Sequence, residues 1–139
     1  MVISEKRWMR RFSCYLGVLQ HLENFVAIGK TRVRSVAEEF AVIKAFELTF
    51  ECAWNVINDF LQGRGYSQIY GPRDAIRFAV RAGLIKDGEI WFDIMAKCGN
   101  AAHAYDEETV RKMSCVVSDE YMKEFRHLKT SFERLKGAE

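Results

Sequence analysis

The sequence predicts an all-α fold, an up-and-down helical bundle of about five helices, three of them long. Three observations lead to this prediction. Apolar residues recur at steps of three and four through most of the chain, no segment shows sustained alternation, and there is only one proline. A chain of 139 residues with 49% hydrophobic residues can bury one good core. We therefore expect a single domain over residues 1–139.

The first expected helix covers about residues 4–28, because Trp8, Phe12 and Val26 belong to one apolar face. Gly29 is expected to end this helix, since glycine is common just after a helix. A short basic connection follows.

The second expected helix covers about residues 35–62 and has the strongest helical pattern. Ser35 and Glu38 form an S-x-x-E capping box at its start. Glu47 and Glu51 lie four residues apart inside it, where like charges repel unless a basic group faces them. We expect a partly buried, structural ion pair between these glutamates and an arginine.

Three shorter signals divide the rest of the chain. Pro72 is expected to open a short helix, which Gly83 closes. Asp87 is expected to cap the next helix, and Gly99 predicts a bend or an end near its last turn. Asp106 is expected to cap one final long helix that carries acids in its first turn.

Composition restricts the class of protein. There are 21 Lys and Arg against 19 Asp and Glu, a net charge of +2, which argues against a strongly basic nucleic-acid coat. The N-terminus has no signal-peptide pattern, and no uncharged run has the length of a membrane span. The cysteines form no C-x-x-C pair, which argues against a zinc or redox motif and favours a reducing compartment. We expect a cytoplasmic protein without a cofactor, a metal or a membrane partner.

His103 is the strongest candidate for a chemical role. Asn100 precedes it by three residues, on the same helical face, and Tyr105 follows two residues later. These side chains could form a polar site at a helix corner. A structural histidine with a tyrosine packed beneath the corner remains the alternative.

A second candidate is the arginine strip, which we define as Arg73, Arg77 and Arg81. The spacing of four residues places all three along one side of the short helix. The strip is either a plain solvated face or a docking surface for phosphates or an acidic partner, because arginine binds both in bidentate fashion.

Four segments in order resemble the HEPN superfamily, and in particular its branch of nucleotidyltransferase substrate-binding proteins. They are FELTFECAWNVINDFL at 46–61, GPRDAIRFAVRAGLI at 71–85, DGEIWFDIMAK at 87–97 and HAYDEETV at 103–110. The resemblance covers about residues 5–135. It implies a bundle that forms a homodimer and pairs with a separate minimal nucleotidyltransferase, which carries the nucleotide and metal site.

Related HEPN proteins are toxins of toxin–antitoxin pairs, which cut RNA with an R-x4-H-x-Y motif shared across the dimer. By this resemblance His103 matches the motif histidine, and Tyr105 matches the tyrosine to which the partner adds AMP. Cys98 stands at the position of the motif arginine. Cysteine cannot supply the cation that stabilises charge on a phosphate during cleavage.

The resulting prediction is a non-catalytic accessory subunit that binds a minimal nucleotidyltransferase and has nucleotide or RNA as a further ligand. An active or relic ribonuclease toxin is the alternative, and a plain dimerisation scaffold is a third. The abundance of aromatic residues also predicts an exposed aromatic stripe that a second copy covers.

Overall fold

The structure is a computed structural model that describes residues 2–101, 103 and 106–138. These residues form helices and connections, without a strand among them, so the predicted all-α fold is confirmed. The segments in chain order are α1 (Val2–Thr31), α2 (Val36–Gly63), α3 (Pro72–Arg81), α4 (Gly88–Ala101), α5 (Glu107–Val116), the π-helical η1 (Val117–Tyr121) and α6 (Met122–Ala138).

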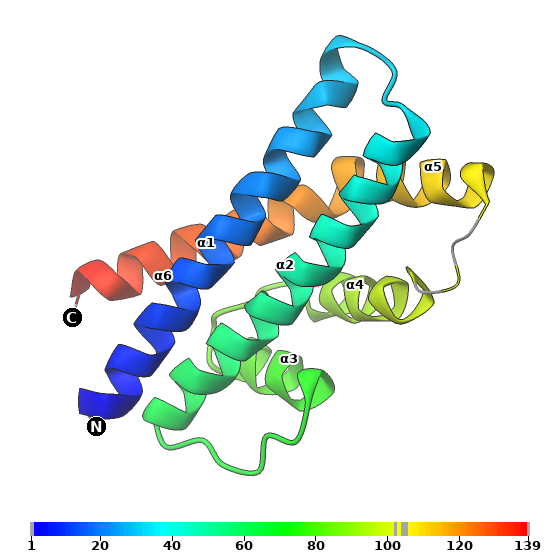
Figure 1. Cartoon of the computed structure of the whole chain (residues 1–139). Helices are drawn as coiled ribbons and strands as arrows, with labels where there is room; N and C mark the ends of the chain where they lie inside the picture. The colour runs from blue at the N-terminus through cyan, green and yellow to red at the C-terminus, as the bar shows by residue number, and fades with distance from the viewer. Residues whose placement is uncertain (1, 102, 104–105, 139) are drawn as a thin grey trace.

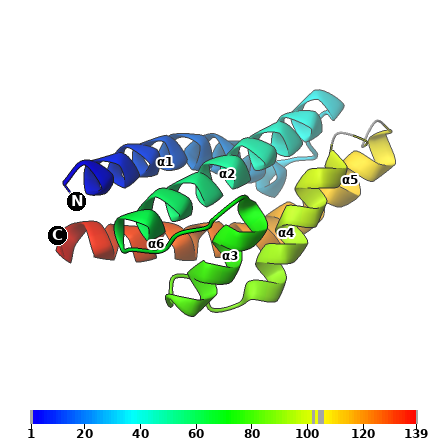
Figure 2. The ribbon, with the colours of Figure 1, turned by 90° about the horizontal axis from the view of Figure 1, so that it is seen from below.

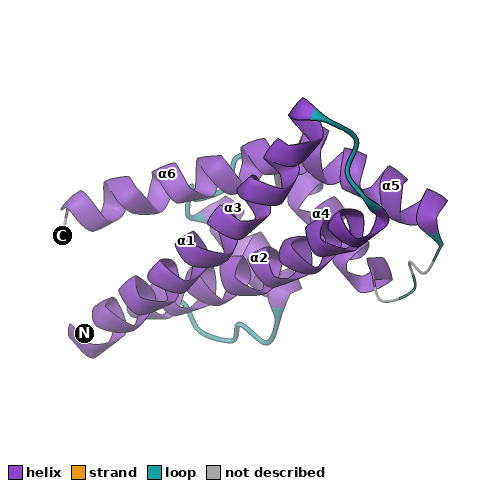
Figure 3. Cartoon of the chain, turned by 45° about the horizontal axis from the view of Figure 1, so that its top comes forward, coloured by secondary structure: helices purple, strands orange, loops and turns teal. Residues whose placement is uncertain are grey.

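Helix α2 is the centre of the arrangement. It runs antiparallel to α1 along most of its length and also packs against α3, α4 and α5 (Figure 1). Seen from below, α5, η1 and α6 follow one another as a nearly continuous rod beneath the α1–α2 pair, and α3 and α4 lie to one side (Figure 2). Figure 3 shows the helices in purple and the described connections, such as that between α2 and α3, in teal.

Aromatic side chains fill the space between α1, α2 and α6. Trp8 packs edge-on against Phe60 and tilted against Phe132, with 5.4 Å between ring centroids in both pairs. The buried hydroxyl of Tyr15 donates a hydrogen bond to the carbonyl oxygen of Phe125 at 2.7 Å. The expected exposed aromatic stripe is wrong, because the aromatic faces of the long helices turn inward. Among the described aromatic side chains, only Phe40 and Tyr70 are largely exposed.

The start signals in the sequence are confirmed. The amide of Glu38 donates to Ser35 Oγ at 3.1 Å, and the amide of Ser35 donates to Glu38 Oε1 at 2.7 Å, which completes the capping box. Asp87 accepts from the amide of Ile90 at 3.3 Å. After α3, Gly83 has φ +82°, a conformation that favours glycine at a helix end.

Gly29 does not end the first helix, contrary to expectation. Helix α1 continues to Thr31, and the guanidinium of Arg34 lies against the Gly29 backbone. A Cβ at position 29 would lie 2.2 Å from Arg34 Nη1. The glycine therefore provides space for the side chain of Arg34, which folds back from the α1–α2 connection onto the last turns of α1.

We expected one final long α-helix, but the structure interrupts it. Five residues, Val117–Tyr121, form a π-helical turn between α5 and α6. Val117, Tyr121 and Phe125 are all buried and lie four residues apart, a spacing that reads as an ordinary α-helix in the sequence. π-helical turns of this kind are often found at functional sites. None of the helices in the described ranges has the length and apolar character needed to cross a membrane.

Candidate functional site

The corner between α4 and α5 carries the predicted polar residues. Helix α4 ends at Ala101, and the amide of His103 donates to the carbonyl of Asn100 at 3.0 Å. The side chains of Asn100 and His103 are both exposed. Tyr105 lies outside the described residues, so the expected histidine–tyrosine pair stays a prediction. The corner offers an exposed imidazole to solvent.

Asp106 fixes the start of α5 next to this corner. Its Oδ2 accepts hydrogen bonds from the amide of Thr109 at 3.0 Å and from the Thr109 hydroxyl at 2.9 Å. These two bonds, the backbone one first, lower the pKa of Asp106. The carboxylate therefore acts as the helix cap that the sequence predicted.

Cys98 lies on α4 and faces α2. Burial is the main reason that the pKa of its thiol rises to about 12, and the charges of Glu47 and Glu51 raise it further. The thiol is therefore neutral at physiological pH. The position at which the resemblance expects an arginine holds no cation and lies next to two carboxylates.

The expected ion pair between Glu47 or Glu51 and an arginine is not formed within the described part of the chain. Glu51 instead accepts hydrogen bonds from Trp54 Nε1 at 3.1 Å and from the amide group of Asn55 at 3.4 Å, both on its own helix. On α4 the glutamates lie near enough to Cys98 for their charges to raise the pKa of its thiol, and a neutral thiol cannot form an ion pair with a carboxylate.

A hydrogen bond between Tyr121 and Asp93 holds α4 against η1. The Tyr121 hydroxyl donates to Asp93 Oδ2. Burial of the tyrosine, followed by this hydrogen bond and the charge of Asp93, raises the pKa of Tyr121 well above its usual range. The phenol thus remains a proton donor, and the contact positions the helix that carries Cys98.

The arginine strip lies on the surface of α3. Arg73, Arg77 and Arg81 are all exposed. The guanidinium of Arg73 stacks over Phe92 of α4 at 5.7 Å from the ring centroid, and that of Arg81 stacks over Phe78 at 5.5 Å. Arg77 lies 3.8 Å from Asp74 in an exposed pair.

The strip and the His103 corner are separate regions. Phe92, which Arg73 contacts, and Asn100 are eight residues apart on α4, which corresponds to about 12 Å along the helix axis. The structure therefore does not bring the two sets of predicted residues into one site.

A buried charge cluster was missed by the sequence reasoning. Arg34 Nε donates to Glu39 Oε1 at 2.9 Å, and the two residues are only 8% and 4% exposed. Arg111 of α5 lies 3.7 Å from the same oxygen and donates to the carbonyl of Arg34 at 3.3 Å. No local pattern in the sequence connects these three residues, because they come from different segments.

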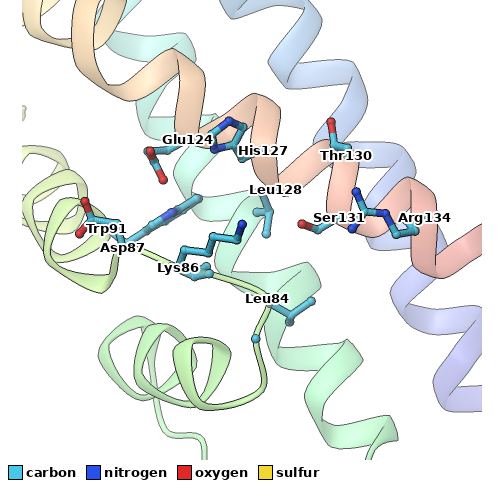
Figure 4. A pocket seen from close by; sticks show the side chains of 12 residues that line it. Leu84, Lys86, Asp87, Trp91, Glu124, His127, Leu128, Thr130, Ser131 and Arg134 are labelled. Atoms are coloured by element: carbon cyan, nitrogen blue, oxygen red, sulfur yellow. The ribbon is translucent and has the colours of Figure 1, made fainter.

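A cavity of about 380 Å³ was also missed. It lies between α6 and the connection from α3 to α4 (Figure 4). The side chains of Lys86, His127, Ser131 and Arg134 line it. The signal in the sequence is the spacing of the last three, which places them along one side of a helix. In the described ranges, no group of three or more His, Cys, Asp or Glu side chains is arranged to hold a metal ion.

The fold defines an all-α helical bundle with an exposed polar corner, an exposed arginine strip and a cavity beside α6. Residues 10–134 match a family described as nucleotidyltransferase substrate binding protein like. The chain belongs to this family. No curated protein matches it.

Proposed function

We propose that the protein is a non-catalytic accessory subunit of a separate minimal nucleotidyltransferase, and that it belongs to the HEPN superfamily. The observation that carries the proposal is the neutral Cys98 at the position of the motif arginine. Its thiol is half-buried, has a pKa of about 12 and lies beside Glu47 and Glu51. The family match over residues 10–134 supports a role in nucleotidyl transfer.

The chemistry of RNA cleavage supports the non-catalytic assignment. Attack by a 2′-hydroxyl needs a base near that hydroxyl and a cation for the charge that develops on the phosphate. His103 is exposed and could act as the base. The cation is missing at position 98, and the neighbouring glutamates would repel a phosphate there.

We propose a homodimer that forms through α2. Val36, Phe40 and Leu48 follow one another along α2 at steps of four and eight residues, within about a third of the helix circumference, and are 39%, 40% and 44% exposed. A cavity of about 250 Å³ between α1 and α2, with Val18, Phe25 and Leu48 in its lining, continues this apolar surface. Charge placed at Leu48 should weaken such an interface.

The pairing is tested by capture from a native cell extract. The tagged chain should retain a nucleotide-binding protein with the size of a minimal nucleotidyltransferase, about 100 residues as the resemblance implies. Light scattering of the purified chain should give twice 16.1 kDa, and Leu48→Glu should reduce the mass. A stable monomer at micromolar concentration would contradict the dimer. Failure of the tagged chain to retain any such nucleotide-binding protein would contradict the pairing.

Ribonuclease activity is the second candidate function, because His103 is exposed and could act as the base. In that case Tyr105 would be the AMP acceptor. Under the non-catalytic assignment, by contrast, the unmodified chain should barely cleave RNA, because loss of one preorganised charge donor costs about two to three orders of magnitude in rate. Cys98→Arg should raise cleavage, since it restores a cation at the motif position, and adding His103→Ala should remove the gain. Robust cleavage by the unmodified chain that His103→Ala abolishes would reverse the order of the two functions.

A further inference from the structure

Two adjoining cavities run along one side of α6, and we call them together the α6 groove. The first is the 380 Å³ cavity of Figure 4, and the second, about 420 Å³, continues it toward the C-terminal end of α2. Gly83, Leu84, Ser131 and Arg134 line both. Volumes of this size are typical of small-molecule sites.

Positive charge gathers in the middle of the groove. The side chain of Lys86 extends from the α3–α4 connection toward α6, and His127, Ser131 and Arg134 face it from α6 (Figure 4). In the part of the chain that the structure describes, neither Lys86 nor Arg134 forms an ion pair. Two cations without an acid partner and a hydroxyl donor beside them form a suitable site for a phosphate group.

Negative charge lies at the other end of the first cavity. Asp87 and Glu124 are close to Trp91, away from Ser131 and Arg134 (Figure 4). Asp87 Oδ1 already accepts from the amide of Ile90, which holds the carboxylate in place. These two carboxylates repel any anionic group of a ligand at this end of the cavity and can accept hydrogen bonds from its hydroxyl or amino groups. The groove is therefore polarised along its length.

The groove is distinct from the His103 corner. It contacts α4 at the N-terminal end of the helix, whereas the corner follows its C-terminal end. Helix α4 has 14 residues, which corresponds to about 20 Å along its axis. A ligand in the groove therefore does not depend on the motif residues at 98 and 103.

We propose that the α6 groove binds a phosphate monoester whose other end carries hydroxyl or amino groups, the chemistry shared by mononucleotides and sugar phosphates. The phosphate lies between Lys86 and Arg134 and accepts from Ser131, and the donors at the other end reach Asp87 and Glu124. This inference deepens the proposed function, on which it rests for the role of the ligand as a substrate. Binding itself is a property of this chain alone.

Calorimetric titration of the purified full chain tests the proposal, with AMP, glucose 6-phosphate, adenosine and inorganic phosphate as probes. At least one of the two monoesters should bind more tightly than inorganic phosphate, and adenosine should not bind measurably. Lys86→Gln and Arg134→Gln should each weaken monoester binding about tenfold or more, because each removes one charged contact to the phosphate. Lys136→Gln is the matched control, since Lys136 is an exposed cation of α6 outside both cavities.

The outcomes separate the possible ligands. Preference for AMP or for glucose 6-phosphate identifies which of the two sources the groove fits. Binding of inorganic phosphate as tight as that of both monoesters overturns the proposal, because the acidic end then contributes nothing. Equal effects of Lys136→Gln and Arg134→Gln, or no binding of either monoester, also overturn it. A chain that captures the nucleotidyltransferase but binds no monoester would refute the groove and leave the pairing intact.

Discussion

The guanidinium of Arg34 packs directly against the backbone of Gly29, in a space that any other residue at position 29 would fill. A Cβ there would lie 2.2 Å from Nη1 and 2.9 Å from Cζ. Arg34 cannot move away without cost, because it donates to Glu39 Oε1 at 2.9 Å and to the carbonyl oxygen of Val26 at 3.1 Å. One glycine thus allows the α1–α2 loop to place a buried charge next to α5.

Gly29→Ala should therefore destabilise the protein. Displacing Arg34 leaves Glu39 buried with only Arg111 near it, and loss of one partner from a buried pair costs about 3–5 kcal/mol. A gain of up to about 1 kcal/mol from helix propensity offsets part of this cost. We expect a net loss of about 2–4 kcal/mol in the free energy of unfolding, measured by denaturant titration.

Gly17→Ala is the matched control for this prediction. Gly17 also lies in α1, is exposed, and has no other atom within 4 Å of the position of a Cβ. Alanine there should stabilise the protein by about 1 kcal/mol. If both substitutions change the free energy of unfolding equally, the position of the Arg34 guanidinium does not depend on the absence of a side chain at Gly29.

Glu38 should contribute to acid sensitivity. Its hydrogen bond with Arg32, and then that with the amide of Ser35, lowers the pKa of Glu38 from the usual 4.5 to about 2. A lowered pKa means that the ionised carboxylate favours the folded state. Its contribution is therefore complete above about pH 4.5 and is lost as the pH falls from 4.5 toward 2.

Melting temperatures measured between pH 2 and 6 test this contribution. Glu38→Gln keeps a side chain suited to the capping box but removes the charge. The variant should show a smaller loss of melting temperature in the acid range than the unmodified protein. Glu133→Gln, at an exposed position of α6, should leave the pH profile unchanged. Parallel profiles for Glu38→Gln and the unmodified protein would contradict the prediction.

The four cysteines should differ in reactivity toward iodoacetamide. Cys14 and Cys115 are exposed, whereas Cys52 and Cys98 are partly buried. Burial raises the pKa of Cys98 to about 12, so almost none of it is thiolate at pH 7, and the thiolate is the reactive form. Mass spectrometry of the native protein should find Cys14 and Cys115 alkylated well before Cys98. Early alkylation of Cys98 would argue against its burial on the side of α4 that faces α2.

The arginine strip should act in binding and not in folding. Because both side chains are exposed, Arg77→Glu should change the free energy of unfolding by about half a kcal/mol or less, and Arg73→Glu, which also loses the stacking on Phe92, by about 1 kcal/mol or less. If the strip docks an acidic partner, each reversal should reduce capture of the nucleotidyltransferase from extract. Lys112→Glu, another exposed position, is the control. If both strip variants capture the nucleotidyltransferase as well as the unmodified chain does, the strip is a solvated face without a docking role.

Local sequence determined most of the secondary structure of this protein. The capping box of Ser35 and Glu38, the proline at the start of α3 and the caps at Asp87 and Asp106 all work through contacts of three or four residues. The apolar spacing likewise placed the core-facing sides of α1 and α2. Such features are readable in the sequence because the atoms that interact are neighbours in the chain.

Only the tertiary structure decided what surrounds each polar group. The sequence predicts a helix end at Gly29, but the structure places the guanidinium of Arg34 against that glycine. The sequence also predicts an arginine partner for Glu47 and Glu51, but the structure places them near the neutral thiol of Cys98. The π-helical turn at Val117–Tyr121 follows an ordinary α-helical spacing in the sequence. The α6 groove combines Lys86 from one connection with Ser131 and Arg134 from a distant helix. The groove and the surroundings of Glu47 and Glu51 depend on how helices pack across the core, which brings together residues that no local pattern connects. The contact at Gly29 depends on the direction in which the α1–α2 connection folds back, which the hydrogen bonds of Arg34 to Glu39 and Val26 fix.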